Sequence, residues 1–275
     1  MRTRDSEPRA IGPCFGWVML AALALAATTG PASAADYTAR ALTEAFYRAK
    51  AGERLDFSGK DLSFLDLAGI DFKGATLAHA NLYGVDLTRS SLRGSDLSGV
   101  RLDRAVMVSA DFSGANLEGA SLMRPSVYTS LYANRDEAPK FAGANLRGIR
   151  MTAMMDGVDF RGADLTEARL GPHEPRADIS SMPSSFLRGC DFSGAILKGA
   201  DLMWAKLAFS RFVGADLSDA NLSGVDLSKA DLSGADLTGA DITDADFDGA
   251  NLKGAKGLLG AKGWSRAKNL DRALQ

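Results

Sequence analysis

The chain has 275 residues and an almost balanced charge, with 32 Lys and Arg against 34 Asp and Glu and a net charge of −2. This balance gives no sign of a broad nucleic-acid-binding surface. Two histidines and two cysteines leave little material for a histidine- or thiol-based site. The length and the 46% hydrophobic composition suffice for one or two packed domains.

Residues 1–34 have the pattern of a secretory leader. Three arginines precede an apolar run at 14–27, and the small triplet Ala32-Ser33-Ala34 ends the segment. Fourteen apolar residues are short for a membrane span, although an uncleaved anchor is the alternative. We therefore expect a signal peptide that is cleaved after Ala34, a periplasmic or secreted bacterial protein, and no membrane span after cleavage.

Residues 35–54 are predicted to form an N-terminal capping helix. Leu42, Phe46 and Ala49 recur at helical spacing and would form one apolar face. We expect this face to cover the first turn of the structure that follows, because an open end of stacked strands invites aggregation.

From residue 57 onward, a large apolar residue recurs at every fifth position, a period that fits neither a helix nor a strand. Two long runs, Phe57 to Val127 and Leu187 to Leu252, follow this rule without exception. A small residue often lies two positions earlier, Asp or Asn one position earlier, and Gly two positions later. A very short strand followed by a tight turn explains these preferences, so the chain must coil.

The pattern A-[DN]-[LF]-x-G, as in ADLSG at 230–234 and ANLEG at 115–119, resembles the pentapeptide-repeat family. The resemblance covers most of residues 55–256. It implies an all-β fold, a right-handed quadrilateral β-helix with four pentapeptides in each coil. It says little about function. Some family members resemble acidic duplex DNA and bind DNA gyrase, but the predicted leader argues against such a role here.

The repeat is interrupted at 128–140, 152–159 and 171–186, where we expect loops. If Tyr132 is a repeat centre, the breaks are three pentapeptides apart and should cluster on one side. Loops on a rigid scaffold often carry function, and interfaces favour Tyr, Met and Arg. The candidate protein-interaction residues are Tyr128, Tyr132, Arg135, Met154, Met155 and His173.

Two alternatives remain open for these interruptions. They can be surface insertions without a role, since long loops are tolerated. They can also build a soft-metal site from methionine and histidine, of the kind that binds Cu(I), with the candidates Met154, Met155, Met182 and His173.

Residues 257–275 are predicted to form a C-terminal cap helix, because apolar residues recur at helical spacing at Trp264, Ala267, Leu270 and Leu274. This helix would cap the last coil or carry a homodimer contact. The preceding stretch 244–255 matches the first six positions of an EF-hand loop, but its twelfth position is Ala255 instead of Glu. The weak calcium candidates are Asp244, Asp246 and Asp248.

These observations favour a non-catalytic protein without a cofactor. No nucleophile elbow is present, and Cys190 takes a repeat position that usually holds a buried alanine. We expect an exported β-helix scaffold that binds another periplasmic protein through its loops and binds no nucleic acid. The alternative is a metal-binding protein that uses the clustered aspartates or the Met/His loops, and a gyrase-type DNA mimic is less favoured.

Overall fold

The computed structural model describes residues 35–50, 52–129, 134–172 and 184–274. The chain divides into the units Met1–Ala32 and Ser33–Gln275. The predicted leader, Tyr132, His173 and Met182 lie outside the described residues.

The N-terminal element is helix α1, Ala39–Arg48. The hydroxyl of Thr38 caps it by accepting the N–H of Ala41 at 3.1 Å. Its apolar face is buried through Leu42 and Phe46, and the Phe46 ring lies 5.4 Å from the ring of Phe57 in the first coil.

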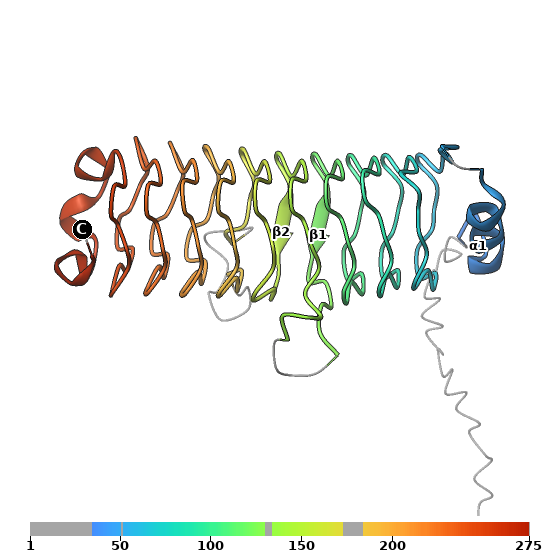
Figure 1. The fold of residues 1–275 in the computed structure, drawn as a ribbon, viewed down its shortest axis with the longest axis horizontal. Helices are drawn as coiled ribbons and strands as arrows, with labels where there is room; N and C mark the ends of the chain where they lie inside the picture. The colour runs from blue at the N-terminus through green and yellow to red at the C-terminus, as the bar shows by residue number, and fades with distance from the viewer. Residues whose placement is uncertain (1–34, 51, 130–133, 173–183, 275) are drawn as a thin grey trace, which may run out of the picture. The chain divides into compact units, whose positions relative to one another are not determined.

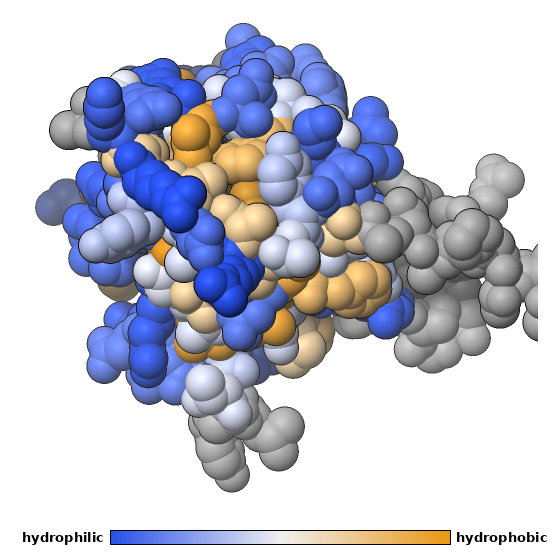
Figure 2. All heavy atoms as spheres, turned by 90° about the vertical axis from the view of Figure 1, so that its right-hand side faces the viewer, coloured by the Kyte–Doolittle hydropathy of each residue, from blue (hydrophilic) through white to orange (hydrophobic). Residues whose placement is uncertain are grey.

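A lysine of the first coil holds the other end of α1. The Lys73 ammonium donates to the carbonyl oxygens of Phe46 at 2.7 Å and Ala49 at 3.1 Å. A cation at a helix C-terminus satisfies carbonyls that lack intrahelical partners. In Figure 2, which looks at this end of the molecule, apolar residues are partly covered by hydrophilic ones. Among the described residues, no helix has the length and apolarity needed to cross a bilayer.

From Asp56 to Leu274 the chain winds in successive coils joined by parallel bridges (Figure 1). Bridge partners in the regular regions are 20 residues apart, as in Asp56↔Thr76. They form four ladders, which we name after their first members: Asp56, Asp61, Asp66 and Asp71. Within the described chain two segments are longer strands, β1 (Ser121–Met123) and β2 (Arg150–Thr152), which pair in parallel in the Asp61 ladder.

One pentapeptide illustrates how the sequence produces a corner. Leu232 and Ala230 point inward and are buried. Between them, Asp231 points outward, and its Oδ1 accepts the N–H of Ser233 at 3.1 Å. Gly234 then takes a φ of +68°, which a residue without Cβ adopts at no steric cost. The Asp side chain and the glycine together make the tight turn that the repeat needs.

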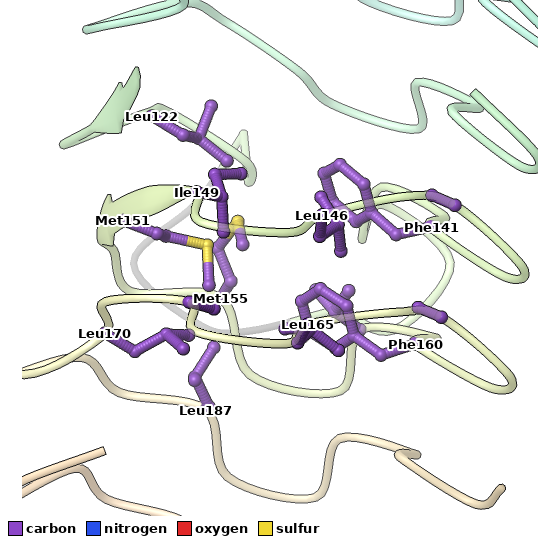
Figure 3. Packing of buried hydrophobic residues seen from close by; sticks show 14 of the residues in the cluster. Leu122, Phe141, Leu146, Ile149, Met151, Met155, Phe160, Leu165, Leu170 and Leu187 are labelled. Carbon is purple, nitrogen blue, oxygen red and sulfur yellow. The ribbon is translucent and has the colours of Figure 1, made fainter. Parts of the chain in front are cut away.

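The core is a continuous stack of inward side chains (Figure 3). Because equivalent positions repeat in each coil, like side chains stack on like. The stacked phenylalanine rings are 4.8 to 5.4 Å apart and nearly parallel, in the series Phe112, Phe141, Phe160, Phe192 and Phe212. This spacing is close to the ~4.8 Å between neighbouring strands.

The segment 152–159, predicted as a loop, is instead a repeat that is one residue short. Met155 is fully buried and points into the core beside Met151 (Figure 3). Only four positions separate these two methionines, so the bridge Arg150↔Arg169 joins residues 19 apart instead of 20. A one-residue shortening breaks the five-residue count but not the coil. Met155 is therefore not an exposed interaction residue.

The two other interruptions are insertions. The bridge Asp111↔Lys140 joins residues 29 apart, which leaves nine additional residues, and Met154↔Phe186 joins residues 32 apart, which leaves twelve. The ladders place Phe141 directly after Val127 around the coil, so the assumption of a repeat centre at residue 132 is wrong. The first insertion projects from the stack below β1 in Figure 1.

The C-terminal cap helix that the sequence predicted is not formed. The chain makes three separate 3-10 turns, η1 (Leu258–Gly260), η2 (Trp264–Arg266) and η3 (Leu270–Arg272). Between these turns it continues the ladders, with bridge partners 21, 22 and 23 residues apart at Lys262, Lys268 and Leu274. The segment is thus a last, wider coil. Its bridges pair backbone N–H and C=O groups of the preceding coil, which a detached helix would leave without partners.

Candidate interaction surface

An outward-facing apolar pair lies on the Asp66 ladder, with one side chain exposed and the other half-buried. Met154 and Phe186 are direct bridge partners in successive coils. Their chain neighbours Met155 and Leu187 point inward and are buried, so Met154 and Phe186 point outward. Met154 is 65% exposed. Since most equivalent positions on the ladders carry Asp or Asn, this pair is a local departure from the repeat.

Tyr128 lies beside this pair on the same face. Its hydroxyl donates to the backbone carbonyl of Asp156 in the next coil. Burial, together with the nearby Asp156 carboxylate, raises the pKa of Tyr128, so the side chain stays a neutral phenol. Asp156 in turn accepts the backbone N–H of Arg188 at 2.8 Å, and the Arg188 guanidinium lies over the Phe186 ring at 5.4 Å.

Arg135 crosses the adjacent corner. Its Nη2 donates to the carbonyl of Gly189 at 3.4 Å. Its aliphatic part lies over Gly157, where an added Cβ would meet Arg135 Cγ at 2.8 Å. The glycine at this turn therefore allows the side chain of the first insertion to pack on the coil.

Glu137 anchors the same insertion. Its carboxylate accepts the backbone N–H of Thr129 at 2.7 Å and the Thr129 hydroxyl at 2.9 Å. These two hydrogen bonds lower the pKa of Glu137. The two ends of the insertion are thus tied together, and Arg135 is held near the apolar pair.

A hollow of about 290 Å³ adjoins Met154. It is lined by Arg124, Pro125, Thr152, Ala153, Met154 and Ser184. A hollow of this size and lining suits a single large apolar side chain. We name one set of residues the loop-flanked surface: the exposed Arg135, Met154 and Arg188 and the half-buried Tyr128 and Phe186.

The structure brings three of the predicted residues, Tyr128, Arg135 and Met154, to one face. Met155 is buried beneath them. Sequence reasoning missed Phe186 and Arg188. A signal was present, because Phe186 stands immediately before an inward leucine, where the repeat usually has Asp or Asn.

The weak calcium candidates have other partners. The Asp244 carboxylate pairs with Arg266 at 2.6 Å, and Asp248 pairs with Arg272 at 2.9 Å. Asp246 accepts from Asn269 Nδ2 at 2.7 Å. Within the described ranges no group of three His, Cys, Asp or Glu side chains could hold a metal ion. These aspartates tie the last coil to the preceding one, which argues against the calcium interpretation.

The positions of Met154 and Met155 also argue against the soft-metal interpretation. Met154 points outward while Met155 points into the core, so their sulfur atoms cannot converge on one ion. Cys190 packs as a small buried residue: its thiol donates to the carbonyl of Met155 at 3.1 Å, and burial raises its pKa. A protonated, buried thiol is a poor metal ligand.

The family model of pentapeptide repeats matches the chain in eight copies, over 56–94, 86–122, 140–171, 185–224 and 215–254. These ranges cover more than half of the chain. The chain belongs to the pentapeptide repeat family. The predicted family is confirmed, and with it the right-handed β-helix that such repeats form. The matched ranges leave out 123–139 and 172–184, where the ladders place the two insertions.

Several solved structures are similar to this pentapeptide repeat protein. HetL, from the cyanobacterium Nostoc and involved in heterocyst differentiation regulation, is 28% identical over 82% of this chain and 90% of its own, with a TM-score of 0.40. A thylakoid lumen pentapeptide repeat protein of Arabidopsis thaliana is 32% identical over 43% of this chain and 61% of its own, with a TM-score of 0.20.

QnrB1, a plasmid-mediated fluoroquinolone resistance protein, is 20% identical over 74% of this chain and 84% of its own, with a TM-score of 0.26. Comparison with curated proteins gave no significant match. The family assignment therefore depends on the repeats themselves.

Proposed function

We propose that this protein is an exported, non-catalytic scaffold that binds another protein through the loop-flanked surface. The observation that supports this most is the outward-facing Met154–Phe186 pair, with Tyr128, Arg135 and Arg188 around it on one face of successive coils. Aromatic residues, Met and Arg are the types enriched at protein interfaces. The partner's anchor is an apolar side chain that enters the hollow beside Met154.

The rest of the molecule acts as a rigid frame for this surface. In this proposal each coil is quadrilateral, one side to a ladder, α1 caps the N-terminal end and the last coil closes the other. Hydrogen bonds between coils continue through both insertions, as from Phe112 N–H to the Lys140 carbonyl at 2.8 Å. A surface held by such a frame is preorganised, which lowers the entropic penalty of binding.

The test compares two variants in affinity capture from periplasmic extract. The variant Met154→Asp with Phe186→Ser removes the apolar pair. The control is Phe64→Ser, which removes an aromatic side chain that is 73% exposed on another ladder. We expect the wild type and the control to capture the same partner protein. The double variant should not capture it. Retention by the double variant, or loss by the control, would contradict the proposal.

The aspartate-rich coils at residues 216–248, here called the acidic coils, offer a competing surface. Asp231, Asp236 and Asp241 point outward in three neighbouring pentapeptides. Their replacement by Asn would keep the turns, because Asn221 accepts the N–H of Ser223 in the same way at 3.1 Å. Loss of capture in this triple variant alone would move the site to the acidic coils.

A homodimer contact at the C-terminal end is a second proposal. Leu259 is 85% exposed there, beside a hollow of about 450 Å³ lined by apolar residues that include Leu258 and Trp264. Light scattering of the wild type and of Leu259→Asp tests it: the wild type should have twice the monomer mass and the variant the monomer mass. A monomeric wild type at micromolar concentration rules the dimer out.

A further inference from the structure

A groove on the Asp61 ladder contains two neighbouring arginines. Arg150 and Arg169 are direct bridge partners in successive coils, and both side chains are exposed. They line two hollows, of about 510 Å³ and about 240 Å³, which also share Asp201. The larger hollow exists because Gly148 and Gly199 present no side chains at its walls.

Arginine is unusual at this position of the repeat. The usual Asp accepts a backbone N–H two residues later, as Asp201 does from Met203 at 3.1 Å. Arginine has only donors and cannot make this contact. Several other arginines on the coils have a carboxylate partner, as in Arg147–Asp164 at 3.2 Å. In the part of the chain that the structure describes, Arg150 and Arg169 take part in no ion pair.

Two like charges that face each other across a ladder repel. Aspartates in this protein also oppose one another, as in Asp216↔Asp236, but their charge is stabilised by backbone N–H groups. Of the two arginines, Arg169 has Asp201 as its other ladder partner, whereas the other partner of Arg150 is the uncharged Ser121. An oxyanion between them would remove the repulsion, and the planar guanidinium matches phosphate with two parallel hydrogen bonds.

The groove also offers hydrogen-bond acceptors. Glu167 and Asp201 line it together with the two arginines, and carboxylate oxygens accept hydrogen bonds from hydroxyl groups. The volume of about 510 Å³ is in the range of small-molecule sites. We propose that this groove binds a phosphate monoester that carries hydroxyl groups, the class of sugar phosphates. The phosphate lies between Arg150 and Arg169, and the hydroxyls lie on Glu167 and Asp201.

Calorimetric titration in phosphate-free, low-salt buffer tests the site with glucose 6-phosphate, inorganic phosphate and glucose. We expect glucose 6-phosphate to bind saturably, inorganic phosphate about tenfold more weakly and glucose not at all, since each charge-assisted contact is worth roughly a factor of ten. Arg150→Gln with Arg169→Gln should abolish both phosphate signals. Glu167→Gln with Asp201→Asn should bring glucose 6-phosphate to the affinity of inorganic phosphate.

The matched control is Arg93→Gln with Arg211→Gln, which removes the same charge on the Asp71 ladder. There Arg93 pairs with Asp111 at 3.0 Å, and Arg211 stands between Asp191 and Asp231. This control should bind like the wild type. No saturable binding of glucose 6-phosphate by the wild type, or equal loss in both arginine pairs, would overturn the proposal. Equal affinity for inorganic phosphate and glucose 6-phosphate would overturn the sugar-phosphate class.

Thermal unfolding gives a second readout that does not depend on the heat of binding. Glucose 6-phosphate should raise the melting temperature of the wild type and of the control, but not of the Arg150→Gln/Arg169→Gln variant. Without ligand, Arg150→Gln alone should melt no lower than the wild type, because it removes the repulsion from Arg169 and its other ladder partner, Ser121, carries no charge. A lower melting temperature for this variant would show that the arginine stabilises the fold, against the proposal.

Discussion

Residues that are neighbours in the chain have opposite environments in each pentapeptide. Leu97 is fully buried in the stack, whereas Ser98 points to the surface and gives its N–H to Asp96 at 3.1 Å. The five-residue pattern therefore predicts the effect of a substitution from its position alone. The inward position decides stability, and the outward positions decide what the protein can bind.

The pair Leu97 and Ser98 gives a direct test. Leu97→Asp would bury an unpaired carboxylate and should destabilise the protein by about 4 kcal/mol or more. Ser98→Lys, one position later, should change stability by less than about 0.5 kcal/mol. Urea unfolding measures both. Equal destabilisation by the two variants would be incompatible with the inward position of Leu97.

The aspartates predict how stability depends on pH. Burial by itself would raise the pKa of Asp103, but hydrogen bonds from Ser121, Arg101 and the Met123 N–H lower it below the ordinary value. A depressed pKa contributes stability above the unfolded-state value of about 3.9, and this stability is lost as the pH falls through the folded-state pKa.

We therefore expect the urea midpoint to be constant from pH 8 to 5 and to fall below about pH 4. Asp103→Asn should lower the midpoint at pH 7 and reduce the fall at low pH. A fall that begins between pH 7 and 5 would indicate that groups other than these carboxylates dominate.

The end elements are held by a few specific contacts. Lys73 joins the last turn of α1 to the first coil, while Asp244 and Asp248 pair with arginines of the last coil. Neither element extends the regular five-residue pattern, so each depends on side chains that the repeat itself does not require.

Loss of the Lys73 contact should loosen α1 selectively. In Lys73→Ala, two carbonyls lose their charged donor, which should cost about 1.5–3 kcal/mol, the range for hydrogen bonds to a charged group. Amide hydrogen exchange in residues 39–48 should accelerate while the coils keep their protection. Lys198→Ala, a substitution on a middle coil, is the control. Unchanged exchange in α1 would mean that its apolar face suffices.

Calcium should have no effect on the last coil, because Asp244, Asp246 and Asp248 already have protein partners. The melting temperature should be the same in millimolar Ca²⁺ and in EDTA. A calcium-dependent rise that disappears in Asp246→Ala would revive the metal-binding alternative.

At the scale of the whole molecule, the repeats form one continuous core from Leu42 to Leu252 and beyond. Each coil contacts only its neighbours, so stability is a sum of local terms and their interfaces. The loop-flanked surface and the arginine groove lie in the same coils, on neighbouring ladders. Both consist of outward side chains, so we expect both to tolerate substitution without loss of the fold.

Export is the prediction that concerns the whole chain. Expressed in a bacterium with a periplasm, the full-length protein should be recovered from the periplasmic fraction with Ala35 as its first residue. Ala34→Phe should block this cleavage and leave a larger, membrane-bound form. A cytoplasmic protein with an intact leader would refute the prediction.

The sequence alone determined the coil, because the rule is local. Within five residues, a large apolar side chain, an Asp or Asn and a glycine decide what points inward and where the chain turns. The helical spacing within 35–54 likewise predicted a helix, which the structure forms as α1, and the repeat pattern identified the family. Tertiary structure was not needed for these conclusions.

Only the tertiary structure decided which coil positions are neighbours. A missing residue at 152–155 looks like a loop in the sequence, and the spacing at 257–275 fits a helix as well as three turns joined by bridges. The pairs Met154–Phe186 and Arg150–Arg169 meet across 32 and 19 residues. These separations depend on how many residues are inserted into a coil or missing from it. The hydrogen bonds between coils show this number, whereas the five-residue pattern does not.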